Sequence, residues 1–478
     1  MSGKRTVITG HIVSGDDIIG ELPDGAVLIE DGRIEAVTRD AREFAGIDAE
    51  HLETAGGFVL PGMVDSHRHT WMSLLRAHSC DQSLLEFLGN TFYGIGSVVT
   101  AEDLGTAALV GALEALDAGV TTILDCCDCV NTPDHATAGI AGLRESGIRF
   151  RYAYGIQSFD FRPPGFAAHA ERLTDAARVR AELLPGGDGL GDMAMLLSDF
   201  GTLPFTDTAA EVRLARELGV LIASHTGAAP NSVLLRGLHE MRRHGLLTPG
   251  HLHIHCPALD ESEWQLLADT GAKVSIAPET EMQMGMGHPP FRACIDHGIL
   301  PGISTDIVAV GSGDLFSQMR LGLQHQRALD NHRVHRSGGM PAAIDLTVRD
   351  AFTWATRGSA EALGLGDRIG SLTPGKQADV IVVKPRMDLA PTGHPLGTVV
   401  LQSTAADVDT VLVAGRVRKQ AGRLVGIDTA AVRTRAVEAA DRIRTNAAAL
   451  TVHSAQDCAA WFAHADATAN AHFAAADR

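Results

Sequence analysis

Two histidines separated by one residue, His67 and His69, directly follow an apolar stretch that is typical of a buried strand. Side chains at positions i and i+2 of a strand end point to the same side, so both imidazoles can face one point. Two imidazoles in that arrangement form half of a metal site. A pair of hydrogen-bonded structural histidines is an equally good interpretation of these two residues taken alone.

Three further strand-like segments also end in residues that bind metals. The run from Val220 ends in His225, the run from Leu252 ends in His255, and the run from Leu300 ends in Asp306. Three or more histidines with one carboxylate suit Zn²⁺ or Fe²⁺ and leave room for a bound water. A metal held there would lower the pKa of that water toward neutrality and make it a nucleophile.

The elements that position these residues follow a repeating pattern, in which a helical segment ends in Gly and an apolar run follows. Gly is favoured just past a helix end because it adopts the left-handed conformation without a Cβ penalty. N-terminal caps are expected at Thr100 with Asp103, Thr208 with Glu211, and Asp260 with Glu263. Eight apolar runs qualify as strands: Val59–Val64, Val120–Leu124, Ile148–Gly155, Met193–Leu197, Val220–Ala223, Leu252–Ile254, Lys273–Ile276 and Leu300–Ile303.

Alternating helices and strands predict the α/β class, with a mostly parallel sheet. Eight strands in this length favour a closed (β/α)8 TIM-like barrel, whose functional residues lie at the C-terminal ends of the strands. A doubly wound open sheet is the alternative, but it would normally carry a Gly-rich loop after its first strand. Here that strand is followed by Asp65, Ser66 and His67.

The two ends of the chain have a different texture from the middle. Thr6 to Ala55 and Gly370 to Leu424 both contain short β-like runs with turn signals. We interpret residues 1–56 and 368–425 as two halves of one small β-sandwich and residues 57–367 as the catalytic barrel. Residues 426–478 are Ala-rich and predict a helical tail, in which His453, His464 and His472 are expected to be ordinary surface residues.

Composition narrows the function classes. The formal net charge of −18 disfavours binding to nucleic acid or to anionic membranes, because both reward basic patches. The seven cysteines are an odd number and do not suggest a disulfide framework in so long a chain. Neither a secretory signal nor a transmembrane run of 18 or more apolar residues is visible. The expectation is a cytoplasmic protein with a small-molecule substrate.

The segment from Pro61 to His69, with Leu74-Leu-Arg76 after it, resembles the opening signature of the amidohydrolase superfamily. The order of ligand-type residues is similar to that of the branch containing cytosine and guanine deaminases and triazine hydrolases. This resemblance implies one divalent metal ion per chain, zinc or alternatively iron, held by His67, His69, His225 and Asp306. It further implies that His255 contacts the bound water or the substrate, that Asp306 also shuttles protons, and that the chain forms a homodimer or higher homo-oligomer.

The sequence departs from this branch at two positions. Deaminases of the branch usually carry Glu three residues after the fifth-strand His, where this chain has Ala228, and often a His where it has Ile276. Deamination needs a proton delivered to the leaving nitrogen, and Glu279 or Glu281 could supply it from a neighbouring strand end. A solvated loop is an equally good interpretation of these two glutamates.

Other candidate residues carry weaker signals. Cys126 and Cys129, with His51-Leu-Glu53, superficially match the zinc deaminases that act on nucleobases, but no Pro precedes the first Cys, and no His is paired with these cysteines in the sequence. The candidate substrate contacts are Trp71, Arg76, Gln157, Gln283 and His288.

The expected function is metal-dependent hydrolysis of a C–N bond in a small, heterocyclic molecule, with deamination as the first choice. Dechlorination or cyclic amide hydrolysis by the same metal site is the alternative, since Ala228 removes the usual proton carrier. An alternative of another class is a non-catalytic relic that binds a ligand without turnover.

Overall fold

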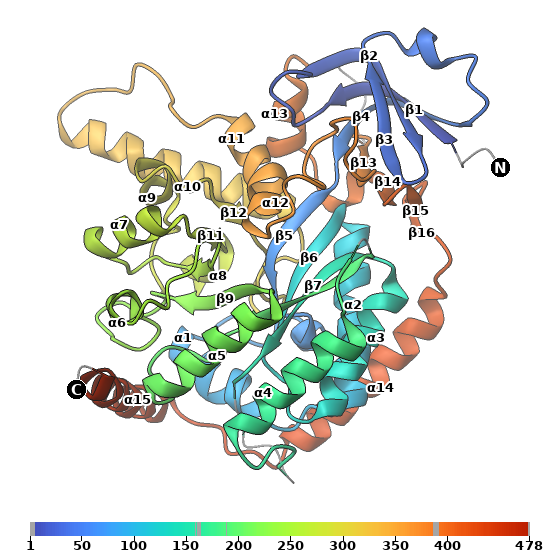
Figure 1. The fold of residues 1–478 in the computed structure, drawn as a ribbon. Coiled ribbons are helices and arrows are strands. Elements are labelled where there is room, and N and C mark those ends of the chain that lie inside the picture. The colour runs from blue at the N-terminus through green and yellow to red at the C-terminus, as the bar shows by residue number, and fades with distance from the viewer. Residues whose placement is uncertain (1–4, 158, 160–163, 188, 386–391, 477–478) are drawn as a thin grey trace.

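Eight parallel strands form one sheet in chain order, from β5 to β12. The computed structural model describes residues 5–157, 159, 164–187, 189–385 and 392–476, and Figure 1 shows the sheet surrounded by helices. Backbone hydrogen bonds from Asp306 N to His67 O (3.1 Å) and from His69 N to Asp306 O (3.0 Å) join the last strand to the first. The expected (β/α)8 barrel is therefore confirmed. Its strands are β5 (Met63–Arg68), β6 (Val120–Cys127), β7 (Arg149–Gly155), β8 (Gly191–Leu196), β9 (Leu221–Thr226), β10 (Leu252–His255), β11 (Lys273–Ile276) and β12 (Gly302–Ile303).

The barrel interior is filled by small and branched side chains, including Val64, Leu124, Ala153, Ala223 and Ile254. Such residues pack in layers inside an eight-stranded barrel and leave no pore. The helices that accompany the strands are α2 (Ala101–Asp117), α3 (Pro133–Ser146), α4 (His169–Arg178), α5 (Phe205–Leu218), α6 (Leu238–Arg243), α7 (Glu261–Thr270), α8 (Pro278–Gln283), α9 (Phe291–Asp296), α10 (Leu315–Arg336), α11 (Val348–Thr353) and α12 (Ser359–Ala362). Between β5 and α2 lie α1 (Leu84–Glu86) and a π-helical segment over Phe87–Ile95, here called η3.

Two of the three expected helix caps are confirmed, and one is wrong. Thr100 and Asp260 cap α2 and α7, each with the expected acidic partner three residues later. The helix α5 instead begins at Phe205, after Pro204, so the expected cap pair lies inside it. Proline has no N–H to donate and disrupts a helix interior, so it is tolerated at the start of a helix and not within it. Glu211 consequently turns inward, where Ser198 donates to it through Oγ (2.6 Å) and N (3.0 Å).

A second, mixed sheet is built from both chain ends, in the order β16-β15-β14-β13-β4-β1-β2-β3. Only the β1–β4 pair is parallel among the paired strands described for this sheet. The second β unit that was expected from the two ends is thus present. Its strands are β1 (Arg5–Val13), β2 (Glu21–Glu30), β3 (Arg33–Thr38), β4 (Glu50–Pro61), β13 (Val380–Val383), β14 (Val408–Val413), β15 (Arg416–Gln420) and β16 (Arg423–Leu424).

The expected strand Val59–Val64 divides between the two sheets. β4 continues to Pro61 and pairs with β13, whereas the barrel strand β5 begins at Met63. The apolar run is continuous because residues on both sides of Gly62 are buried, each in its own sheet. Gly62 itself fits only without a side chain, since a Cβ there would lie 2.2 Å from Oγ1 of Thr121.

The C-terminal segment is helical, as its composition predicts. It forms α14 (Thr429–Ala447) and α15 (Ala455–Ala476), while α13 (Pro395–Leu401) lies earlier, between two strands of the second sheet. In Figure 1, α15 lies beside α1 and α5, and contacts between these helices are present. No helix in the described ranges is both long and apolar enough to span a membrane.

Candidate metal centre and active-site cavity

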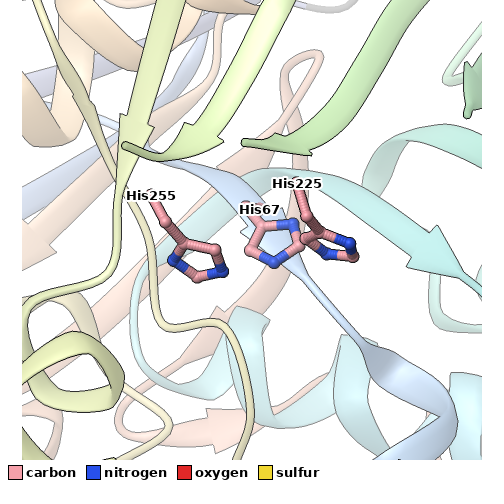
Figure 2. Close-up of side chains that lie close together, drawn as sticks. All are labelled: His67, His225 and His255. Atoms are coloured by element: carbon pink, nitrogen blue, oxygen red, sulfur yellow. The ribbon is translucent and has the colours of Figure 1, made fainter. Parts of the chain in front are cut away.

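Four imidazoles and one carboxylate converge at the C-terminal ends of the barrel strands. Nε2 of His67 and Nε2 of His69 lie 3.0 Å and 3.4 Å from Oδ1 of Asp306. Ligand atoms of two overlapping groups, His67 with His225 and His255, and His67 with His69 and Asp306, all lie within 4.8 Å of one another inside each group. Figure 2 shows the rings of His67, His225 and His255 lying close together. The residues predicted from four strand ends are therefore brought together.

The other ring nitrogen of each histidine is fixed by a neighbouring group. Nδ1 of His67 contacts Sγ of Cys126 at 3.1 Å, and Nδ1 of His69 contacts Oδ2 of Asp128 at 2.5 Å. The corresponding atoms of the other two rings pair in the same way, His225 with Asp199 and His255 with Glu281, both at 3.2 Å. Contacts of this kind fix the tautomer and ring orientation of metal-binding histidines. All four Nε2 atoms are thereby left for a metal or a substrate.

Local backbone irregularities aim these side chains. The pairing of β5 with β6 shifts between Asp65 and Arg68, and a bulge of this type redirects the side chains beside it. His255 and Asp306 have positive φ angles of 77° and 59°, which non-glycine residues rarely adopt. Strained backbone of this kind concentrates at functional sites. On β10, where Leu252 and Ile254 face the barrel interior, regular alternation would point His255 outward.

The electrostatics of the cluster favour the metal-binding forms of His67 and Asp306, whereas they favour the protonated form of His69. Burial lowers the pKa of His67 to about 3, so its imidazole is neutral. Burial alone would raise the pKa of Asp306, but the surrounding imidazoles, His67 first, hold it well below its usual range. For His69, burial is outweighed by the Asp128 carboxylate, which raises its pKa to about 9. Metal binding to His69 must therefore release a proton.

A divalent metal ion fits the residues present. Nε2 of His67 is buried and has no hydrogen-bond partner in the described part of the chain, although Oδ1 of Asp306 is 3.0 Å away. An unpaired buried nitrogen is costly, and a shared ion between these two atoms would satisfy it. Imidazole nitrogens with one carboxylate are a donor set suited to Zn²⁺ or Fe²⁺.

A mostly apolar cavity opens beside the cluster. His69, His225, His255, Asp306 and Asp199 form its polar part. Ala228, at the position where the resembling branch carries Glu, lines the cavity too. The rest of the lining is Met72, Leu84, Phe87, Leu88, Phe92, Leu235, Thr280, Met284, Met286 and Ile307. The cavity therefore combines a reactive end with a lining suited to an uncharged, aromatic or aliphatic molecule.

The two glutamates considered as proton carriers occupy different places. Glu281 is fully buried and contacts Nδ1 of His255, and burial raises the pKa of its carboxyl group. Oε2 of Glu279 accepts hydrogen bonds from Ser312 N (2.6 Å) and from Nε2 of Gln318 (2.6 Å). Neither glutamate lines the cavity. Glu281 reaches the site only through His255.

None of the five predicted substrate contacts lines the cavity. The indole of Trp71 donates to Asp128, and Gln157 bonds to Tyr93 and accepts from Asp199 N. Arg76 is 57% exposed and pairs with Glu114. The other two are Gln283, which donates to the carbonyls of Cys80 and Val310, and His288, which contacts His325.

Sequence reasoning missed the partners that fix the imidazoles. Asp128 and Asp199 stand just past β6 and β8, so the strand-end rule that selected His225 could have selected them. The sequence pairs no His with Cys126 and so gives no sign of a role for its sulfur in the site. The structure corrects that point, since its sulfur contacts His67. The pairing escaped notice because it joins two neighbouring strands rather than two sequence neighbours.

Comparisons with known proteins agree with this geometry. A model described as the amidohydrolase family matches residues 58–418. The chain belongs to the amidohydrolase family. It is 30% identical over 439 residues to 5-methylthioadenosine/S-adenosylhomocysteine deaminase of Symbiobacterium thermophilum, covering 87% of this chain and 93% of the relative. A similar relative, 5'-deoxyadenosine deaminase of Methanothermobacter thermautotrophicus, is 25% identical, with 86% and 94% covered.

A solved structure extends the likeness to the whole fold. An adenosine deaminase from Xanthomonas campestris with bound zinc superposes with a TM-score of 0.81 at 26% identity, covering 92% of this amidohydrolase and 98% of that chain. The fold and the family make this amidohydrolase a hydrolase that acts on C–N bonds.

Proposed function

We propose that this amidohydrolase removes the 6-amino group of an adenine nucleoside, converting C6–NH₂ and water into a C6 carbonyl and ammonia. The observation that carries the proposal is the convergence of four imidazole Nε2 atoms and Asp306 beside a largely apolar cavity. The deaminase names of the relatives, which refer to adenosine derivatives, support the choice of base.

We propose zinc as the metal, one ion per chain, held by His67, His69, His225 and Asp306. The zinc-containing neighbour supports this choice over iron, although the donor atoms suit both. A bound divalent ion would supply a Lewis acid that lowers the pKa of water and polarises the reacting carbon.

Proton transfer falls to the residues that face the cavity from the cluster. Oδ1 of Asp306 points to His67, while its Oδ2 lies 3.9 Å from Nε2 of His255. Oδ2 is thus placed to take a proton from the attacking water and to pass it to the leaving nitrogen. His255, held by Glu281, is placed to donate a hydrogen bond to the developing oxygen or to the ring of the substrate.

Ala228 motivates a second candidate reaction. In the described lining, Asp199 and Asp306 are the carboxylic acids, and none stands at the Ala228 position. A leaving group that departs as an anion, such as chloride, needs no proton. Dechlorination is therefore the alternative that Ala228 favours if ammonia is not released, whereas opening of a cyclic amide would still need a proton on its leaving nitrogen.

The test is ammonia release by zinc-loaded protein from adenosine, 5'-deoxyadenosine, methylthioadenosine and S-adenosylhomocysteine, with adenine, guanine and chlorotriazines for comparison. We expect release from at least one adenine nucleoside and loss of that release in His67→Ala. Absence of ammonia from every amine, with zinc confirmed in the protein by elemental analysis, would reject deamination, and chloride release would then support the alternative.

We also propose that the protein is a cytoplasmic enzyme that forms a homodimer or higher homo-oligomer through its C-terminal helices. Light scattering of the purified protein tests the second point, and a monomeric mass at micromolar concentration would reject it.

A further inference from the structure

The helix α15 packs against segments that form the cavity, although it lies beyond residue 418, where the family match ends. Its contacts include α1, η3 and α5, and Figure 1 shows it beside α1 and α5. The side chains of α15 that face the rest of the protein recur at the spacing of one helix face. They include Cys458, Asp466, Ala469 and Phe473.

One anchor of α15 fixes the loop after β9. Oδ1 of Asp466 accepts hydrogen bonds from Ser232 Oγ (2.5 Å), Val233 N (2.8 Å) and Leu234 N (3.3 Å). The next residue, Leu235, lines the cavity and has a φ of 63°. A leucine in the left-handed region is strained, so its position depends on contacts that hold the loop. Asp466 supplies three of them through one carboxylate oxygen.

A second anchor fixes the aromatic side of the cavity. The side chain of Asn90, in η3, forms two hydrogen bonds with the backbone of His453, which lies just before α15. Its Oδ1 accepts from His453 N (2.8 Å), and its Nδ2 donates to His453 O (3.1 Å). The rings of Tyr93 and Trp461 pack with centroids 5.5 Å apart. The same short segment of the chain supplies Phe87, Leu88 and Phe92 to the cavity lining.

Three glycines on different segments permit the close approach of α15. A Cβ added to Gly89 in η3, to Gly201 after β8 or to Gly237 after β9 would meet the helix rather than open space. The nearest atoms would be Sγ of Cys458 at 2.9 Å, Cβ of Ala469 at 2.4 Å and the ring of Phe473 at 3.0 Å, respectively. These distances are too short for ordinary carbon contacts, so each segment is shaped to receive the helix.

We infer that α15 is a brace that sets the width of the substrate cavity, with Asp466 as a positioning residue for Leu235. The helix holds two parts of the lining, the 84–92 segment and the 232–235 loop, and contributes no side chain to the cavity itself. Its effect is therefore on which substrates fit and how tightly, rather than on the chemical step. The turnover part of the test rests on the proposed deamination, whereas the positioning of the loop does not.

The experiment compares Asp466→Ala, the conservative Asp466→Asn, and the matched control Asp441→Ala on α14. Asp441 is 59% exposed and pairs with Arg444 on its own helix. Hydrogen exchange of residues 229–237 reports on the loop, and kcat and KM are measured for adenosine and for the bulkier S-adenosylhomocysteine. We expect Asp466→Ala to lose exchange protection in the loop and to change the ratio of the two KM values by about tenfold. The Asn variant, which keeps an acceptor oxygen, should restore both, and kcat should change less than KM.

Unchanged exchange in Asp466→Ala, or equal changes in KM for both substrates, would overturn the brace. If that variant does not fold, Ser232→Ala removes one donor to the same oxygen and leaves the helix intact, with the same expectations. If the wild-type protein releases no ammonia, the proposed function fails, and the exchange measurement alone decides the positioning role.

Discussion

The floor of the cavity and its walls are built by different parts of the chain. The floor consists of polar residues at strand ends, and each of its four imidazoles contacts a side chain on or just after a neighbouring strand, as His67 contacts Cys126. The walls consist of apolar residues on η3, on the loop after β9 and on the Met284–Met286 segment. A barrel fixes strand ends rigidly, while loops take their shape from what packs on them. The floor therefore carries out the chemistry, and the walls determine which substrates fit.

The largest effect is expected from the floor itself. His67→Ala removes the nitrogen that contacts Asp306, so both the metal content and the turnover should collapse. Loss of a residue that only supports a metal ligand typically costs up to roughly 100-fold, and the loss here should be larger. Elemental analysis and ammonia release measure this. His253→Ala is the matched control, because His253 is equally buried on the same barrel but bonds to Thr226. Retained metal and turnover in His67→Ala would refute the assignment of the floor.

Variants of the two glutamates near the rim, Glu281 and Glu279, test how far the catalytic floor extends. Glu281→Gln weakens the contact that orients His255, so kcat should fall by about 10- to 100-fold with little change in KM. Glu279→Gln alters a carboxylate bound to Ser312 and Gln318, so its kcat should change only a few-fold. Steady-state kinetics of both variants, with thermal unfolding to verify folding, provide the measurement. Equal losses would mean that the floor extends farther than the contacts indicate.

The same division explains how far sequence reasoning could reach. His67, His225 and Asp306 were predictable, because strand ends converge in any eight-stranded barrel, whatever the loops do. Gln157 and His288 were chosen by position along the chain, yet their side chains turn to Tyr93 and His325. Leu235 could not be predicted, because the loop that carries it bonds through the neighbouring Leu234 to Asp466, more than 200 residues away. Side-chain direction in loops is set by such distant contacts, which a single sequence does not reveal.

A wall residue should change selectivity with a smaller effect on chemistry. Met286 is buried and lines the cavity, so Met286→Ala should enlarge the space and favour bulky substrates. The expected change in the ratio of kcat/KM for S-adenosylhomocysteine to that for adenosine is about tenfold, the lower end of the discrimination that one methylene group gives in a hydrophobic pocket. Met319→Ala is the control, because Met319 is fully buried on α10 and outside the lining. If both variants shift the ratio alike, general loosening rather than the wall is responsible.

The smallest effect concerns Glu211, which supports the floor from below through Ser198, the residue before Asp199. Burial raises the pKa of Glu211 to about 7, despite the two hydrogen bonds from Ser198. The folded protein therefore keeps a proton that the unfolded chain loses near pH 4.5, and stability falls as pH rises from about 4.5 to 7. Forced ionisation above that window costs on the order of 3 kcal/mol.

Glu211→Gln removes this ionisation, so its free energy of unfolding should decline less between pH 5 and pH 8 than that of the wild-type protein. Loss of one Ser198 hydrogen bond lowers its stability at every pH and does not change the slope. Urea unfolding at fixed zinc concentration measures the difference, with the exposed Glu217→Gln on the same helix as control. His169, 3.3 Å from Glu211, and the nearby Asp207 and Asp199 are unchanged in all three proteins. Parallel pH profiles for the wild-type protein and Glu211→Gln would show that the buried carboxyl is not the group that couples this part of the floor to pH.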